Sequence, residues 1–181
     1  MGESDPNFFV GIMKISELES LFTGNWRIQH IPTHILSKPE QLEFSRYGYK
    51  CRFPIFITGD TEARARNILL VNGNRVTIGD TAFTLFLRLV VQLLKNKHGV
   101  ISRRKLINCG YINADGEFQS VSRLRQVFNG TLGSLNPQEF IETCQNKSIR
   151  LSIHPALVSY NKEKLLCHHD QRIRKLTRRL P

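Results

Sequence analysis

Hydrophobic positions change their spacing along the chain, and each spacing predicts a different element. Within residues 68–78, two short β-prone runs flank Asn72-Gly73-Asn74. This pattern predicts a β-hairpin, because Asn and Gly tolerate positive φ. Residues 81–96 are apolar on nearly every side, which is typical of a buried core helix. We expect Asp80 to cap this helix and His98-Gly99 to end it.

The pattern after the core helix predicts two more helices and a second hairpin. Ser102 is a candidate N-cap for a helix that runs to about Asn108, and a third helix is expected at about 120–129. Alternating residues in 140–153 surround a turn at Asn146-Lys147-Ser148. We therefore predict an α+β fold with an N-terminal antiparallel sheet, a three-helix core and a C-terminal β-hairpin.

The two ends of the chain are predicted to differ from its centre. Residues 1–45 form an N-terminal extension in which only a short helical spacing over 14–22 stands out. Residues 46–160 carry the strand and helix patterns and are expected to form the main domain. Residues 161–181 form a basic C-terminal tail.

The third predicted helix is amphipathic, with a polar side that suits nucleic acid. At 100° per residue its apolar side contains Val121, Leu124, Val127 and Phe128. Its polar side contains Gln119, Ser122, Arg123 and Gln126, with Arg125 at the flank. Arg can donate to the acceptors of guanine, Gln can pair with adenine, and Ser or Arg can bind phosphate. No acidic residue lies between Glu117 and Glu139 to repel phosphate.

Three short motifs in order resemble a known DNA-binding family. They are VISRRKL at 100–106, VSRLRQVF at 121–128 and FIETCQNKSIRLSI at 140–153. In residues and order they resemble the OmpR/PhoB-type winged helix-turn-helix domain of bacterial transcriptional regulators. The resemblance covers about residues 50–155 and implies that the third helix enters the major groove of double-stranded DNA. It also implies that a wing at about 141–153 contacts the backbone or the minor groove.

The resemblance also implies roles for individual residues. Arg123 would be the main residue that reads bases, whereas Ser120, Ser122 and Arg125 would lie near phosphates. The wing residues that reach DNA would be Thr143, Gln145 and Lys147. Arg103 and Arg104 follow the cap of the second helix, and two interpretations of them remain open: phosphate contacts or a solvated surface.

The chain departs from the family pattern at several places. The family usually has a basic residue where Gln145 stands and a Gly-Tyr pair where Ser148-Ile149 stand. The core helix at 81–96 also looks about one turn longer than usual. We expect no receiver domain of the kind often joined to such domains, since residues 1–45 are too few for one.

Net charge is +11 and is unevenly distributed, which favours an anionic partner. Residues 162–181 contain seven Lys or Arg against two Asp or Glu. Within this tail Ile173, Leu176 and Leu180 have a helical spacing. The tail is therefore either a disordered solubilising end or an element that docks, pairs or adds phosphate contacts.

Other chemistry is not indicated by the sequence. We find no catalytic constellation or cofactor motif, so we expect neither an enzyme nor a cofactor. We also expect no metal site: His30 and His34 are separated by Pro32, and the ligands of CHHD at 167–170 are adjacent and point apart. The four scattered cysteines are expected to be reduced. No membrane span or export signal is visible, which favours a cytoplasmic, nucleoid-associated bacterial protein.

Two functions from different classes remain open at this point. The first is a sequence-specific, DNA-binding transcriptional regulator, which in this class commonly occupies two half-sites as a homodimer. The second is a winged-helix module that contacts RNA polymerase or another regulator. Binding to duplex DNA is the observation that separates the two.

Overall fold

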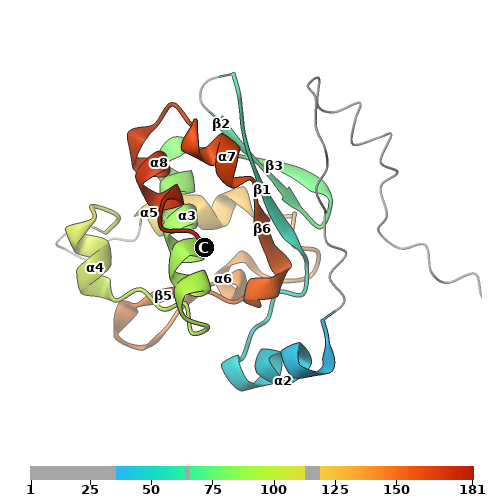
Figure 1. Cartoon of the computed structure of the whole chain (residues 1–181). Coiled ribbons are helices and arrows are strands. Elements are labelled where there is room, and N and C mark those ends of the chain that lie inside the picture. Colours follow the sequence, from blue (N-terminus) through green and yellow to red (C-terminus); the bar gives the residue numbers. More distant parts are fainter. Residues whose placement is uncertain (1–35, 64–65, 113–118) are drawn as a thin grey trace, which may run out of the picture. The chain divides into compact units, whose positions relative to one another are not determined.

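A computed structural model describes residues 36–63, 66–112 and 119–181 (Figure 1). The helix predicted at 14–22, together with His30 and His34, lies outside the described residues. The described residues belong to one compact unit.

Helices and a mixed sheet make up the described part of the chain, so the α+β prediction is confirmed. The helices are α2 (Lys38–Tyr47), α3 (Asp80–Lys95), α4 (Arg103–Asn108), α5 (Gln119–Val127), α6 (Pro137–Phe140), α7 (Lys162–Leu166) and α8 (Gln171–Thr177). The strands are β1 (Ile55–Glu62), β2 (Arg66–Val71), β3 (Asn74–Gly79), β4 (Ile141–Thr143), β5 (Ile149–Leu151) and β6 (Val158–Tyr160). Short 3-10 turns occupy Gln145–Lys147 and Pro155–Leu157.

The larger sheet has the order β3-β2-β1-β6, and this corrects the prediction of an N-terminal antiparallel sheet. The first three strands are antiparallel, but β6 pairs with β1 in parallel, with Ile55 opposite Val158 and Ile57 opposite Tyr160. Because β2 takes one edge of β1, the other edge is open to a later strand. A parallel partner needs a long crossover, which the intervening helices and second hairpin provide.

The first predicted hairpin is confirmed. Strands β2 and β3 pair in register from Arg66 opposite Gly79 to Val71 opposite Asn74. Their two-residue turn has Asn72 at φ +50° and Gly73 at φ +78°. Two successive positive φ values define the tight hairpin turns that match the twist of the strands.

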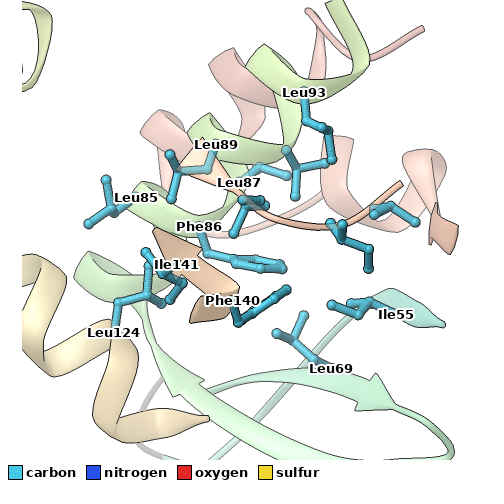
Figure 2. Packing of buried hydrophobic residues seen from close by; sticks show 14 of the residues in the cluster. Ile55, Leu69, Leu85, Phe86, Leu87, Leu89, Leu93, Leu124, Phe140 and Ile141 are labelled. Atoms are coloured by element: carbon cyan, nitrogen blue, oxygen red, sulfur yellow. The ribbon is translucent and has the colours of Figure 1, made fainter. Parts of the chain in front are cut away.

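Helix α3 is the centre of the hydrophobic core, as predicted (Figure 2). Its buried residues are Phe83, Thr84, Leu85, Phe86, Leu87, Leu89, Val90 and Leu93. The expected cap is wrong, because α3 begins at Asp80 and Gly79 is its N-cap. The Asp80 carboxylate accepts one hydrogen bond from Asn67 and contacts His169, and the helix start has no side-chain cap.

The second hairpin is joined to the rest of the fold by a backbone bridge to the residue before α4. Strand β4 pairs with β5, with Ile141 opposite Leu151 and Thr143 opposite Ile149. Ile101, just before α4, forms an antiparallel bridge with Ile149 on the other side of β5. The two backbone hydrogen bonds of this bridge, 2.8 and 3.0 Å long, place the start of α4 beside the hairpin.

The C-terminal segment is folded and docked. Helix α7 lies against β1 and α8 lies against α3 (Figure 1). Buried residues anchor it: Leu165, Ile173, Leu176 and Leu180. The end of the chain is also held, since Tyr160 Oη and Lys162 Nζ donate to the Pro181 carbonyl oxygen at 2.7 and 3.1 Å. Of the two interpretations of the tail, the structure agrees with docking.

Helix α2 was not predicted. It contains Pro39 in its first turn, a position where proline is well accommodated in a helix. Glu40 reaches back to the helix start, where its carboxylate accepts a hydrogen bond from the Ser37 backbone N–H at 2.7 Å. Ser37 and Glu40 have the spacing of a capping box, which is the signal that was overlooked.

Two smaller expectations concern cysteines and membranes. All four cysteines are free thiols, and Cys51 is fully buried. Among the described residues, no helix combines the length and apolar character that crossing a bilayer requires.

Candidate nucleic-acid interface

Helix α5 is anchored by its apolar side. Val121 and Leu124 are fully buried against the core, and Phe128 follows them just beyond the helix end. The Phe128 ring lies 5.5 Å from Phe86 and 5.0 Å from Phe140, measured between ring centroids. This packing fixes which side of α5 faces solvent. The predicted polar side is exposed at Gln119, Ser122, Arg123 and Gln126, whereas Ser120 is half-buried.

Arg123 is the guanidinium on this surface that is available to a ligand. Its side chain is exposed and, within the described residues, has no hydrogen-bond or ion-pair partner. Its donors are therefore not engaged by the described part of the chain. The described part of 101–138 also contains no Asp or Glu, so no carboxylate there competes for this arginine.

Arg125 has a different environment from Arg123. Its Nε and Nη2 donate to the Ile141 carbonyl oxygen at 3.0 and 2.6 Å, and Nη2 also donates to Thr143 Oγ1 at 2.8 Å. Burial lowers the pKa of this half-buried arginine. The structure thus brings the predicted residues Arg125 and Thr143 together, and their bond ties α5 to β4.

The tip of the second hairpin is exposed and carries one cation. Gln145, Asn146 and Lys147 are all exposed, and Asn146 and Lys147 have positive φ values of +57° and +54°. A non-glycine residue in this conformation is disfavoured by about 1 kcal/mol or more. Ser148 stabilises the turn, since its hydroxyl donates to the Gln145 carbonyl oxygen at 2.7 Å. Lys147 has no partner among the described residues.

Helix α4 presents its basic residues next to this tip. Ser102 caps the helix as predicted, with its hydroxyl accepting from the Lys105 backbone N–H at 3.4 Å. Arg104 is exposed without a described partner, whereas Arg103 is half-buried and its Nε has no hydrogen bond. Arg103 and Arg104 follow Ile101, which bridges to β5, by two and three residues.

Acidic residues near the hairpin are neutralised by local cations. Arg150 Nε donates to Glu142 at 2.7 Å, and Lys50 Nζ lies 3.6 Å from Glu142 and 3.9 Å from Glu139. The negative charges that follow α5 are therefore paired within the fold. The exposed surface of α4, α5 and the hairpin tip keeps its positive charge.

A second cluster was missed in the sequence because its members are far apart. Asp80, His168 and His169 bring potential metal-ligand atoms within 4.8 Å of one another. The histidines are adjacent in the CHHD stretch, but their carboxylate partner lies 89 residues before His169. Folding therefore supplies the partner that the sequence alone did not indicate.

Hydrogen bonds around His168 fit a structural network better than a metal site. Its Nδ1 accepts from the Asp170 backbone N–H at 3.0 Å, so the proton lies on Nε2 and is donated to Asn67 Oδ1 at 2.7 Å. A histidine that binds a metal through Nε2 normally donates its Nδ1 proton to an acceptor, and here a donor occupies that position. Asp80 completes the network, accepting from Asn67 Nδ2 at 2.8 Å and lying 2.9 Å from His169 Nε2.

This network connects the start of α8 to β2 and to the first residue of α3. Burial lowers the pKa of His168, and the neighbouring ring of His169 lowers it further. A neutral His168 is the form that the hydrogen bonds require.

Comparison of the chain with protein-family models, with curated proteins and with solved structures found no match.

Proposed function

We propose that this chain is a sequence-specific, double-stranded DNA-binding transcriptional regulator built on a winged helix. Helix α5 is the recognition helix in the major groove, and the hairpin at 141–153 is the wing on the backbone or minor groove. The proposal is supported by the order α4, α5, β4, β5 and by the bonds that join these elements. It is also supported by the resemblance of their motifs to the OmpR/PhoB-type domain.

One observation carries the proposal: Arg123 is exposed, with no partner in the part of the chain that the structure describes, on a helix whose opposite side is fully buried. A guanidinium held in this way can donate two parallel hydrogen bonds to guanine O6 and N7. Gln126 lies three residues further along the same side, where an amide can recognise adenine. A helix that presents Arg and Gln, with no Asp or Glu in its own sequence, is well suited to reading base edges.

The remaining contacts are assigned to phosphates. Arg104 and Lys147 are exposed cations on the two elements that flank α5, and Ser122 offers a hydroxyl. With about five phosphate contacts, the logarithm of affinity falls with the logarithm of salt concentration at a slope near −4.5. Gln145 carries no charge at the wing tip, which keeps the expected number of contacts low.

The test begins with selection of bound sequences from a random duplex pool. Binding of the enriched duplex is then measured by fluorescence anisotropy for the parent and for Arg123→Ala. We expect Arg123→Ala to lose about 1–3 kcal/mol of binding free energy, or about 5–150-fold in affinity, and to relax the preference at one base pair. The matched control is Arg66→Ala, which removes an exposed arginine from β2 and is expected to retain the parent's affinity.

Lys147→Ala separates the wing from the recognition helix. We expect this variant to weaken binding to every duplex alike and to reduce the steepness of the salt dependence by about 0.9. The proposal is contradicted if the parent binds no duplex at low salt. It is also contradicted if Arg123→Ala binds selected and random duplexes as the parent does.

A further inference from the structure

Cations of the C-terminal segment fall into two groups. Lys162, Lys164, Arg172 and Arg174 are engaged within the fold: they contact, in that order, the carbonyls of Leu180 and Pro181, Asp60, Asp170, and the carbonyls of His168 and His169. Lys175, Arg178 and Arg179 are exposed and have no described partner. The fold thus leaves three positive charges unneutralised at the end of α8.

These three cations share one side of a rigid element. Their spacing of three and four residues places them within about 100° on a helical wheel. The opposite side of the segment is buried through Ile173 and Leu176. Lys175 lies in the last turn of α8, and Arg178 and Arg179 directly follow the helix, so the three cations are presented together from a docked segment.

Contacts with α3 locate the surface of α8 relative to the core. The His168 ring lies 6.3 Å from the Phe83 ring, and His169 Nε2 lies 2.9 Å from the Asp80 carboxylate. At 100° per residue, Asp80 and Phe83 lie about 60° apart around the axis of α3. They define the sector of α3 that faces the C-terminal segment.

Contacts of α4 and α5 lie on a different sector of α3. The Phe86 ring lies 5.5 Å from Phe128 at the end of α5, and the Gln92 side chain accepts from Lys105 of α4 at 3.3 Å. At 100° per residue, Phe86 lies about 90° and Gln92 about 150° from the centre of the sector that faces the C-terminal segment. Helices α5 and α4 therefore contact α3 away from the side that faces the C-terminal segment.

We propose that Lys175, Arg178 and Arg179 form a second duplex-binding surface, so that one molecule holds two DNA segments, one on α5 and the other on α8. This inference rests on the proposed function for the α5 surface. DNA is favoured by charge complementarity, since three clustered cations can neutralise neighbouring phosphates without reading bases. A lipid surface is disfavoured, because the apolar side of α8 is buried and cannot insert.

A two-duplex capture assay tests the proposal with the full chain. One duplex is immobilised, and retention of a second, fluorescent duplex is measured as protein is added. We expect the parent to retain the second duplex and the triple variant Lys175→Ala, Arg178→Ala, Arg179→Ala to retain at least about tenfold less. The same variant is expected to bind a single selected duplex within about threefold of the parent, because α5 is unchanged.

A matched control removes three exposed cations elsewhere, in Lys38→Ala, Arg46→Ala, Arg66→Ala. This control has the same net charge as the α8 variant and is expected to capture the second duplex as the parent does. Circular dichroism and a thermal melt verify that both variants are folded. The charge-reversed variant Lys175→Glu, Arg178→Glu, Arg179→Glu is expected to abolish capture completely.

The outcomes distinguish this inference from the proposed function. Single-duplex binding that depends on Arg123, with no capture of a second duplex, overturns the inference alone. Capture that survives in the α8 variant also overturns it, because two copies joined as a dimer would then hold the duplexes. If Arg123→Ala has no effect but the α8 variant loses all DNA binding, the proposed function fails and the α8 surface is retained.

Discussion

Helices α5 and α8 have similar structures but use their arginines differently. Both lie against α3 with a fully buried side, and each has one arginine that is bonded to backbone carbonyls. In α5 this is Arg125, which donates to Ile141, and in α8 it is Arg174, which donates to His168 and His169. In both helices, therefore, one guanidinium serves as a tie between elements.

The second arginine differs between the two helices in whether it has a carboxylate partner. Arg172 forms a bidentate pair with Asp170, the residue that caps α8, through contacts of 2.7–3.2 Å. Arg123 has no such carboxylate partner among the described residues, and the first turn of α5 contains no acidic residue. The comparison teaches that the number of arginines in a helix does not indicate how many are available. The backbone carbonyls and acidic residues placed beside them determine that number.

The largest effect is expected from removing the buried side chains on which this comparison depends. Ile173 in α8 and Leu124 in α5 are both fully buried. We expect Ile173→Ala and Leu124→Ala each to lower the free energy of unfolding by about 2–5 kcal/mol, through lost burial and a residual cavity. Urea denaturation measures both. A loss below about 1 kcal/mol for Ile173→Ala would show that α8 is not part of the cooperative fold.

A smaller effect is expected from the arginine ties. Arg125→Lys keeps the charge but cannot reproduce the two-donor contact with the Ile141 carbonyl. We expect it to lower the free energy of unfolding by about 1 kcal/mol, a value reduced for partial exposure. The matched variant Arg123→Lys is expected to stay within about 0.5 kcal/mol of the parent. Equal losses in the two variants would contradict the distinction between the tie and the free arginine.

Local patterns predicted the parts of the fold whose contacts are close in sequence. The β2–β3 hairpin follows from Asn72-Gly73, and α3 follows from an apolar run long enough to be buried on all sides. Strand β6 has only three residues, and its pairing with β1 joins residues about a hundred positions apart, so no local signal marks it. Asp80 was taken for a cap because Asn67 and His169, which engage its carboxylate, are distant in the sequence.

The same contrast between local and distant contacts applies to the candidate interface. The spacing of Val121 and Leu124 was sufficient to predict which side of α5 is exposed, and the structure agrees. The role of Arg125 was not predictable, because its acceptor is mainly a backbone carbonyl, which every residue possesses. The charge of 162–181 was evident, but its division into engaged and free cations required the positions of Asp60, Asp170 and the C-terminal carbonyls.

The smallest expected effect is a pH dependence that arises in the α8 region. Burial lowers the pKa of His168, whose Nδ1 faces the Asp170 backbone N–H. Below about pH 6.5, the unfolded chain therefore binds a proton that the folded chain does not, and the free energy of unfolding decreases as the pH falls. Above that pH the histidine is neutral in both states, and its contribution is fully present.

His168→Gln tests this dependence, because an amide can still donate to Asn67 but does not titrate. We expect urea denaturation between pH 6.5 and 5.5 to show a shallower loss of stability for this variant than for the parent. Asp170, whose pKa is lowered by its hydrogen bond with Arg172, contributes only below this range. His98→Gln, which replaces an exposed histidine, is the control and is expected to keep the parent's slope. Identical slopes for the parent and His168→Gln would mean that His168 can be protonated in the folded chain, and that its network with Asp170 does not require the neutral form.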